Sequence, residues 1–380
     1  MLEQVNKYLD KLLKQGLVSD RQHVALYGLD DELYTNQGKV SQWVYDVFGK
    51  LNINSLLVAR PEPVLWAIIN ELTRYDEEMI EPRDCESLTF IHDIPVIARM
   101  DALDIAKALN RRKGCIIKGV GIVTSGTVSL EQAFISFSSI CFATFVKYFS
   151  DFINATSGID SKSKFETARI EKVMELLSLS EPDLFENNLS ADIPRDEDTI
   201  LEAMNMAGKA IVEAALVDSF FGNISCRHEA SIYISQTGSS LDELPGYIDA
   251  VPLDGSSSCE LTSSSELGAH IKIYAITGDR VILHGHPKFS VIMSMYGPPL
   301  GFHEKRYVED IPVVTGEVGS GKHGLVHTLP PAMKDGGSAI VHGHGTFCSD
   351  ARSFHEAFDR LMGIEHMCYK ACRDLVEKHS

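Results

Sequence analysis

The spacing of hydrophobic residues predicts two folded regions, and each of them begins with an amphipathic helix. At the start of the chain, Val5, Leu9 and Leu12 recur at the three- and four-residue intervals of one helix face, over Met1–Gln15. A second helical pattern, rich in alanine and methionine, covers Thr199–Val217. Each region therefore contains at least one helix with a face that must be buried against other elements.

After the second of these helices, apolar runs of strand length alternate with helical patterns. The predicted strands are Gly222–Arg227, Ser231–Gln236, Arg280–His286 and Ser338–Cys348. The predicted helices run from an N-cap at Ser263–Ser265 through Tyr274, from Pro287 through Met295, and over Ser353–Val376. Strands that alternate with helices predict an α/β fold built in layers.

A polar segment separates the two regions. Between residues 154 and 197 the chain is rich in small and charged residues, and the one amphipathic stretch within it predicts a short helix at Thr167–Leu177. The sequence therefore predicts a first domain at 1–153, a linker with a helix in it at 154–197, and a second domain at 198–380.

The two regions share three sequence blocks in the same order, which predicts an internal duplication. Gly121–Phe134 reads GIVTSGTVSLEQAF and matches Gly345–Phe358, GTFCSDARSFHEAF, at an offset of 224 residues. The tetrapeptide DIPV occurs at 93–96 and again at 310–313. Upstream, LLVARP at 56–61 matches ILHGHP at 282–287, at an offset of 226 residues. We expect two tandem modules of one architecture.

Charge and cysteine content narrow the range of functions. The chain has 380 residues and a formal net charge of −18, which argues against a nucleic-acid binder, because neutralising phosphates requires an excess of lysine and arginine. Its eight cysteines are scattered, without a CxxC pair, as is usual for reduced thiols in a cytosolic protein. The start of the chain has no signal-peptide pattern, and the most apolar stretch, Ala133–Val146, is too short to span a bilayer. We expect a cytoplasmic protein that acts away from membranes.

Histidines in the second region form a candidate metal site. His284 and His286 flank Gly285 at the end of a predicted strand, and residues two apart on a strand project to the same face. Imidazole nitrogen suits Zn²⁺, with Fe²⁺, Co²⁺ and Mn²⁺ as competitors. A third ligand would come from His342 or His344, which the spacing alone does not separate. Three histidine ligands leave a coordination position open, as in catalytic zinc sites.

The repeat sets these histidines apart from the first region. On the block alignments, His284, His286 and His344 lie opposite Val58, Arg60 and Val120. The first module would then have the same architecture without any of the candidate ligands. We expect it to be a degenerate, metal-free copy.

Five short motifs in the second region resemble the class II aldolase/adducin family, whose reference enzyme is L-fuculose-phosphate aldolase. In chain order they are GNIS at 222–225, TG at 237–238, SSE at 264–266 followed by a histidine and a tyrosine, HGHP at 284–287, and GHG at 343–345 before EAF at 356–358. The resemblance runs from about residue 198 to the end of the chain. It departs from the family at Gly343, where an asparagine is usual.

The resemblance implies a fold and roles for individual residues. The family fold is an α/β/α sandwich around a mostly antiparallel sheet, assembled as a homo-oligomer. By the resemblance, the zinc ligands are His284, His286 and His344, and the acid/base is Glu266. The residues that would hold a substrate phosphate are Asn223, Thr237, Gly238, Ser264 and Ser265.

The resemblance also implies an activity. It predicts a zinc-dependent aldolase, a carbon–carbon lyase that acts on a small phosphorylated sugar through an enediolate. An epimerase or dehydratase on the same metal site is the first alternative, since related enzymes share the three histidines. The second alternative is a non-catalytic binding module of the adducin type.

Overall fold

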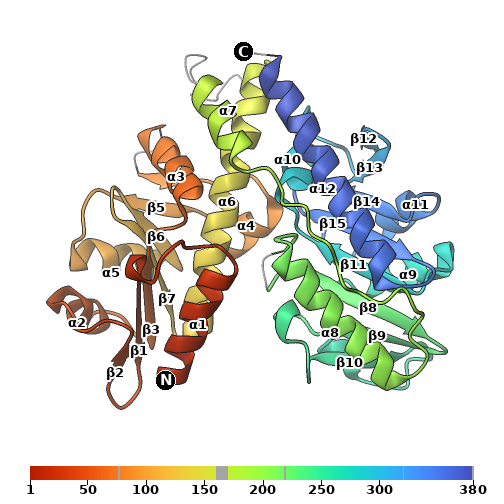
Figure 1. The fold of residues 1–380 in the computed structure, drawn as a ribbon, viewed down its shortest axis with the longest axis horizontal. Coiled ribbons are helices and arrows are strands. Elements are labelled where there is room, and N and C mark those ends of the chain that lie inside the picture. The colour runs from red at the N-terminus through yellow and green to blue at the C-terminus, as the bar shows by residue number, and fades with distance from the viewer. Residues whose placement is uncertain (76–77, 160–169, 218–219, 320, 379–380) are drawn as a thin grey trace. The chain divides into compact units, whose positions relative to one another are not determined.

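The computed structural model describes residues 1–75, 78–159, 170–217, 220–319 and 321–378 (Figure 1). The chain divides into two compact units. The first unit comprises Met1–Phe152 with Lys162–Ser180, and the second comprises Ile153–Ser161 with Glu181–Ser380. Each unit contains one sheet covered by helices.

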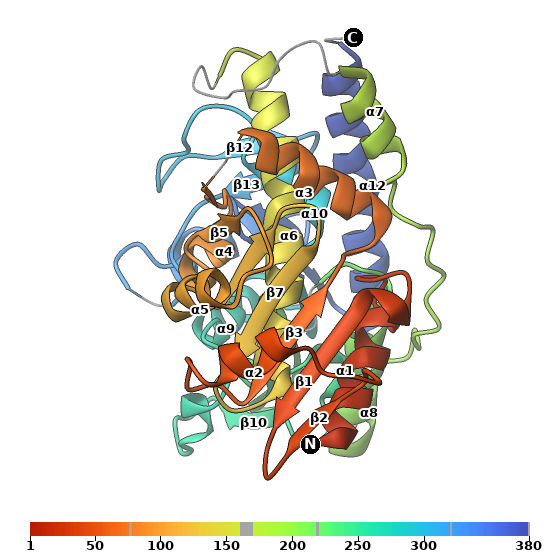
Figure 2. The ribbon, with the colours of Figure 1, turned by 90° about the vertical axis from the view of Figure 1, so that its left-hand side faces the viewer.

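The sheet of the first unit has the strand order β2-β1-β3-β7-β6-β5-β4, with β1, β3 and β7 side by side (Figure 2). Its strands are β1 (Val24–Leu29), β2 (Leu33–Thr35), β3 (Ser55–Ala59), β4 (Met79–Ile80), β5 (Ile94–Ile97), β6 (Gly114–Ile117) and β7 (Gly121–Gly126). Only the β5–β6 pair is parallel among these described strands. The sheet is therefore mostly antiparallel.

Helices cover the sheet of the first unit. They are α1 (Leu2–Lys14), α2 (Gln42–Phe48), α3 (Pro63–Tyr75), α4 (Cys85–Phe90), α5 (Ala102–Arg111), α6 (Leu130–Thr156) and α7 (Ile170–Ser178). Val44 of α2 and Ile105 of α5 share a core with Leu56, Cys115 and Val123 of the sheet. The helix predicted at 167–177 begins among residues that lie outside the described part of the chain, and α7 accounts for its remainder.

The sheet of the second unit has the order β10-β9-β8-β11-β15-β14-β13-β12. Its strands are β8 (Asn223–His228), β9 (Ser231–Ser235), β10 (Ile248–Pro252), β11 (Val281–Gly285), β12 (Arg306–Val308), β13 (Ile311–Val314), β14 (Ser338–Val341) and β15 (Gly345–Asp350). The β13–β14 pair is parallel, and the other described pairs are antiparallel. The mixed α/β class predicted from the sequence is confirmed.

Helices lie on both faces of this second sheet. They are α8 (Glu197–Glu213), α9 (Leu267–Thr277), α10 (Lys288–Ser294), α11 (Leu329–Met333) and α12 (Phe354–Glu377). Ile273 of α9 and Met333 of α11 pack with Ile282 on one face. A side chain at Gly285 would instead meet Ile211 of α8 and Leu361 of α12 on the opposite face. His284, one residue before Gly285, therefore projects to the α9 face, as Ile282 does.

The two sheets share strand order, strand direction and register. When the edge strand β10 is left out, the strands of the second sheet follow the same order as those of the first. In that order, β9, β8, β11, β15, β14, β13 and β12 correspond to β2, β1, β3, β7, β6, β5 and β4. In the first sheet Val58 pairs with Val123, and in the second His284 pairs with Phe347. These pairs are related by the sequence offsets of 226 and 224 residues. The repeated blocks therefore occupy equivalent places in the two sheets.

Two predicted elements were wrong in detail. The apolar run Ser338–Cys348 is two strands, β14 and β15, which pair with each other around a turn at 342–344, where Gly343 has a φ of +62°. The helix predicted to begin at Ser263–Ser265 begins at Leu267, with Glu266 at its N-cap. The serines precede it because Ser263 forms a bridge with Gln236 and the Ser264 N–H donates to the carbonyl of Ser235.

The apolar stretch 133–146 lies within α6, a helix of 27 residues. By length and composition alone, this helix is long enough to cross a membrane. Its most apolar window is 94% buried inside the protein, as in the core helix of a soluble protein. The expectation that this apolar segment is too short to span a bilayer was wrong about its length, because the helix extends beyond residues 133–146 at both ends.

Two glycines at equivalent positions allow the central strands to approach closely. A Cβ on Gly121 would lie 2.5 Å from the carbonyl oxygen of Ala59, and a Cβ on Gly345 would lie 2.3 Å from that of Gly285. Both contacts are with backbone, which cannot move aside without breaking the strand pairing. A side chain at either position must therefore strain the sheet.

We expect Gly121→Ala and Gly345→Ala each to lower the free energy of unfolding by about 1–3 kcal/mol, the usual cost of overpacking. Gly363→Ala is the matched control, because Gly363 lies within α12, is exposed and has nothing within 4 Å of its Cβ position. That change should raise stability by up to about 1 kcal/mol through helix propensity. Denaturant unfolding of the metal-free protein measures all three. Equal stability of the variants at 121, 345 and 363 would contradict the steric argument.

Candidate metal centre

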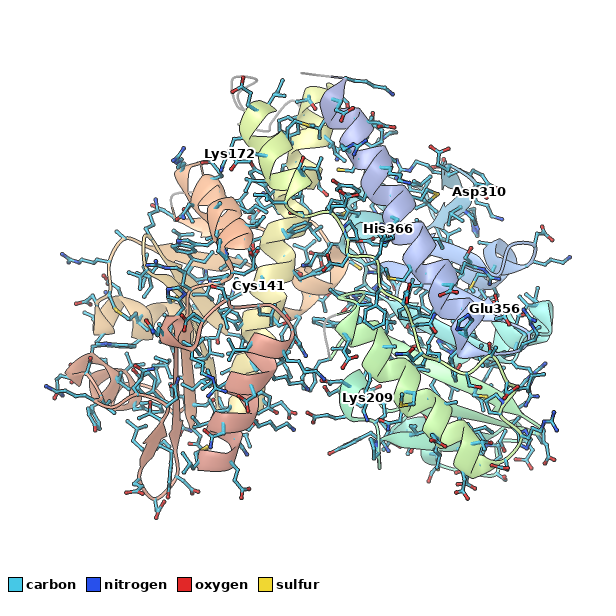
Figure 3. The ribbon with its side chains drawn as sticks, in the orientation of Figure 1. Cys141, Lys172, Lys209, Asp310, Glu356 and His366 are labelled. Atoms are coloured by element: carbon cyan, nitrogen blue, oxygen red, sulfur yellow. The ribbon has the colours of Figure 1, made fainter. Side chains whose placement is uncertain are left out.

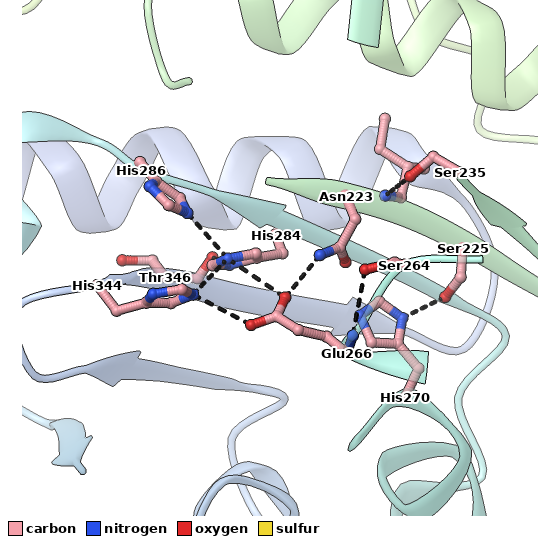
Figure 4. Close-up of polar contacts among 11 residues, drawn as sticks. Asn223, Ser225, Ser235, Ser264, Glu266, His270, His284, His286, His344 and Thr346 are labelled. Atoms are coloured by element: carbon pink, nitrogen blue, oxygen red, sulfur yellow. Dashed lines mark hydrogen bonds and ion pairs between the residues drawn. The ribbon is translucent and has the colours of Figure 1, made fainter. Parts of the chain in front are cut away.

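Three buried imidazoles converge at one end of β11. His284 is the fourth residue of that strand, His286 follows it, and His344 lies in the turn between β14 and β15 (Figure 4). The Nε2 atom of His284 lies 3.1 Å from the Nε2 atoms of both His286 and His344. None of the three side chains is more than 4% exposed. The structure thus brings together the three histidines predicted as ligands.

Neighbouring groups fix the ring of His284. Its Nδ1 atom lies 3.2 Å from the carbonyl oxygen of Thr346, which can only accept, so Nδ1 carries the hydrogen. Burial lowers the pKa of His284 to about 3, so its ring is neutral near pH 7. Its Nε2 lone pair is therefore directed at His286 and His344.

This arrangement fits a tetrahedral metal ion. Nitrogen ligands at the usual zinc distance are about 3.3 Å apart on a tetrahedral ion, close to the separations in this cluster. His284, His286 and His344 can thus hold one divalent ion.

A carboxylate lies beside the three nitrogens. Glu266, at the N-cap of α9, places Oε1 3.1 Å from Nε2 of His344 and Oε2 3.5 Å from Nε2 of His284. Asn223 donates its Nδ2 hydrogen to Oε2 over 2.6 Å. Burial raises the pKa of Glu266, whereas hydrogen bonds from His344 and Asn223 lower it, and the net pKa lies well below the usual range. Glu266 is therefore an ionised, oriented base in a buried site.

Helix α10 supports two of the three histidines. It begins directly after His286 and Pro287, and the side chain of its Ser294 accepts the N–H of Gly343, next to His344. Its first turn is capped by Glu365 of α12, whose two oxygens accept the N–H groups of Phe289 and Ser290 over 2.8 and 2.9 Å. Sequence reasoning missed Glu365. The signal available was an acidic residue on the otherwise apolar face of a predicted helix.

The first unit caps the equivalent helix with a local residue. The side chain of Glu62 accepts the N–H groups of Val64 and Leu65 in the first turn of α3. At the position equivalent to Glu365, at the 224-residue offset, α6 carries Cys141, labelled in Figure 3. The cap of α10 in the second unit therefore comes from a helix distant in sequence, whereas the cap of α3 in the first unit is local.

The residues predicted to hold a phosphate fall into two groups. Asn223 and Ser264 are buried next to Glu266, and the Ser264 hydroxyl accepts the Glu266 N–H over 3.3 Å. Thr237, Gly238 and Ser265 are exposed. The Thr237 hydroxyl donates to the carbonyl of Ser263, so the two loops are tied together. Their phosphate-binding role stays a prediction.

His342, the other candidate for third ligand, does not join the cluster. It is half-buried, and its N–H donates to the carbonyl of Val314 on β13. Because the chain turns at Gly343 instead of continuing as a strand, positions 342 and 344 do not share a face. On the single strand that the sequence predicts over 338–348, His342 and His344 would share a face, and the spacing therefore does not choose between them as the third ligand.

A second buried polar group lies behind Glu266. The Ser225 hydroxyl lies 2.7 Å from Nδ1 of His270 and 2.6 Å from the Tyr274 hydroxyl. Burial lowers the pKa of His270 to about 4, so this ring is neutral. His270 and Tyr274 fasten α9 to β8 through Ser225.

The equivalent place in the first unit has no histidines. Val58, Arg60 and Val120 occupy the aligned positions. The Arg60 guanidinium donates to the carbonyl oxygens of Val120 and Gly119 at 3.4 and 3.3 Å. An arginine side chain thus holds together the two chain segments that the histidines could join in the second unit.

Comparison with known proteins finds one matching family model. A family model described as Class II Aldolase and Adducin N-terminal domain matches residues 202–372. The match includes all three histidines of the cluster and Glu266. No protein with a curated description matches the chain significantly.

Solved structures with similar folds include three aldolase-type proteins. An L-fuculose-1-phosphate aldolase from Thermus thermophilus is 22% identical, with 44% of this chain and 91% of that chain covered and a TM-score of 0.38. A class II aldolase domain from Thermoplasma acidophilum is 13% identical, with 50% and 99% covered and a TM-score of 0.36. A sugar-phosphate aldolase from Thermotoga maritima is 18% identical, with 47% and 94% covered and a TM-score of 0.31. These likenesses are too weak for any functional proposal to depend on them.

The histidine cluster predicts one tightly bound divalent ion per chain. We expect His286→Ala to weaken Zn²⁺ binding by at least about a hundredfold, because it removes a direct ligand. His342→Ala is the matched control and should bind Zn²⁺ as the unmodified protein does. Metal content after dialysis and competition with a chromogenic chelator measure both. Equal losses in the two variants would rule out this ligand set.

Glu365 predicts a pH-dependent stability. Burial raises its pKa to about 7, so the folded protein binds this proton more tightly than the unfolded chain. Its contribution is complete below about pH 4.5 and is lost as the pH rises through about 7. Relative to Glu365→Gln, the unmodified protein should lose about 3 kcal/mol of stability between about pH 5 and 8.

Thermal and denaturant unfolding across this range measure the effect. Glu356→Gln provides the control, since Glu356 lies on the same helix (Figure 3) and its side chain is 40% exposed. Its stability difference from the unmodified protein should stay constant with pH. A pH-independent difference for Glu365→Gln would show that the residue is ionised throughout.

Proposed function

We propose that residues 202–372, which match the class II aldolase and adducin family model, form a metal-dependent carbon–carbon lyase that acts on a small phosphorylated sugar. The observation that carries the proposal is the position of Glu266, an ionised carboxylate within 3.1–3.5 Å of imidazole nitrogens that can bind a metal ion. A non-catalytic binding module would not require an ionised carboxylate beside its histidine cluster. Zinc is the proposed ion, since three imidazole ligands and an open position suit it.

The roles of the residues follow from their positions. His284, His286 and His344 would hold the ion, which as a Lewis acid would stabilise negative charge that develops on a substrate oxygen. Glu266 takes a proton from, or returns it to, the carbon beside that oxygen. Asn223 keeps the carboxylate pointed at the reacting atoms through its 2.6 Å hydrogen bond. The exposed loop groups at Thr237, Gly238 and Ser265, together with Ser264, would bind the substrate phosphate.

We further propose that the first unit is a tandem copy of the same module that has lost the metal. The support is the shared strand order, direction and register of the two sheets. Arg60 forms its hydrogen bonds at the place of His286, so this copy has no equivalent metal-binding cluster among the described residues. Its role would then be structural.

We also propose that the protein works in the cytoplasm as a homo-oligomer. Its eight cysteines form no disulfide within the described part of the chain, as expected in a reducing compartment. The oligomer is proposed on the resemblance to the family.

Release of dihydroxyacetone phosphate from a panel of ketose 1-phosphates, followed with a coupled dehydrogenase, tests the proposed reaction. We expect Glu266→Gln to lower kcat by about 10²–10⁴ while Zn²⁺ stays bound, because only the proton-transfer group is lost. Glu356→Gln should retain full activity.

Other outcomes point to the alternative functions. An epimerised or dehydrated sugar in place of dihydroxyacetone phosphate would identify an epimerase or dehydratase on this site. No turnover, together with no bound metal, would identify a binding module.

A further inference from the structure

A pocket with an unusual charge opens on the surface of the second unit. It has a volume of about 410 Å³ and is lined by Arg195, Arg227, His228, Glu229 and Arg280. Three arginines and one glutamate thus line this pocket, in a chain whose formal net charge is −18. A pocket of this size falls in the range of small-molecule sites.

Two of the arginines are held in place by backbone carbonyls. Arg227 donates from Nη1 to the carbonyl of Tyr274 and from Nη2 to that of Gly278, at the end of α9. Arg280 uses Nη2 for the carbonyl of Pro194 and for Nδ1 of His228. Each guanidinium has five N–H groups, so both keep several donors for a ligand. Fixed guanidinium groups lose little freedom when an anion binds.

The arginines of this pocket form no close ion pair with a carboxylate. Some exposed arginines elsewhere lie within 4 Å of a carboxylate, as Arg21 does with Asp10 and Arg352 with Glu356, whereas Arg60 bonds to backbone carbonyls. Among the described residues, no carboxylate lies that close to the guanidinium of Arg195, Arg227 or Arg280; Glu229 of the pocket pairs at 3.9 Å with His228. Neighbouring guanidinium groups repel, and a bound anion would relieve that repulsion.

The pocket is distinct from the candidate metal centre. Arg280 precedes β11, whereas His284 and His286 lie at its other end, about 13 Å further along an extended strand. Arg227 likewise lies at the end of β8 opposite to Asn223. The two ends of the same strands therefore carry different sets of groups.

We propose that this pocket binds a phosphate-bearing small molecule at a site separate from the metal centre. Arginines that line one pocket and keep spare donors match the several oxygens of a phosphate, which accept charge-assisted hydrogen bonds. A purely structural role accounts for the hydrogen bonds of Arg227 and Arg280. It does not account for Arg195, which lines the pocket and whose side chain forms no hydrogen bond or ion pair with the described residues.

Calorimetric titration of the full chain with inorganic pyrophosphate tests this site, with a chelator present so that no metal contributes. We expect saturable binding that Arg195→Gln weakens about tenfold, the usual effect of losing a charge-assisted hydrogen bond. Arg195 is exposed, so this variant should fold normally, and an unchanged circular dichroism spectrum and Tm would verify that. Arg195→Gln combined with Arg227→Gln should abolish binding.

Arg352→Gln is the matched control, because it removes an exposed arginine of the same unit that does not line the pocket. It should change the affinity by less than twofold. The proposal is overturned if pyrophosphate does not bind, if Arg195→Gln binds it unchanged, or if Arg352→Gln weakens it equally. Citrate in place of pyrophosphate separates the two anion classes, and tighter binding of citrate would overturn the assignment to phosphate. None of these outcomes depends on lyase activity.

Discussion

The pairing of β11 with β15 is the interaction on which the site depends. It opposes His284 to Phe347 and Gly285 to Thr346, and the two rings of the first pair stack at 3.8 Å. Gly345 begins β15 so close to β11 that a Cβ there would also meet the ring of His284, at 2.8 Å. The absence of a side chain at Gly345 is therefore what allows the turn before it to place His344 beside His284. Without that approach, the three nitrogens would be too far apart to share an ion.

Two buried carboxylates in the second unit have opposite pKa shifts, and the difference follows from their neighbours. Burial favours the neutral form of both. Around Glu266, imidazoles and an amide N–H lower the pKa below its usual range, whereas at Glu365 two backbone N–H groups leave burial dominant and the pKa near 7. The first is suited to proton transfer, and the second to holding a helix. The same residue type thus has two functions through its surroundings.

Much of the fold could be predicted from sequence patterns, because the spacing of apolar residues reflects which side chains are buried in each element. The strand carrying His284, the closing helix and the shared blocks of the repeat all lie where the apolar periodicity and the self-comparison predicted them. The turn at Gly343 did not follow, because two short antiparallel strands joined by a tight turn look like one apolar run. The displaced start of α9 has a similar cause: a serine suits an N-cap, but here a bridge to Gln236 holds the serines in extended chain.

The site itself was only partly predictable. Spacing along one strand indicated His284 and His286, and the family resemblance selected His344 and Glu266. Glu365 and Ser294 escaped both kinds of reasoning, because their partners are backbone groups distant in sequence. The arginine pocket escaped as well, since Arg195, Arg227 and Arg280 lie far apart along the chain and meet only in the folded unit.

The cap on α10 has a consequence for the order in which the protein is made. In the first unit, Glu62 caps α3 through N–H groups that lie two and three residues later in the chain. This cap can therefore form as soon as the first turn of α3 has been synthesised. In the second unit the cap residue lies 75 positions after Ser290, on α12. The helix that supports His286 and His344 therefore gains its cap only after α12 has been synthesised. Assembly of the metal centre then waits for α12, by which time the whole of the first sheet is already available to fold.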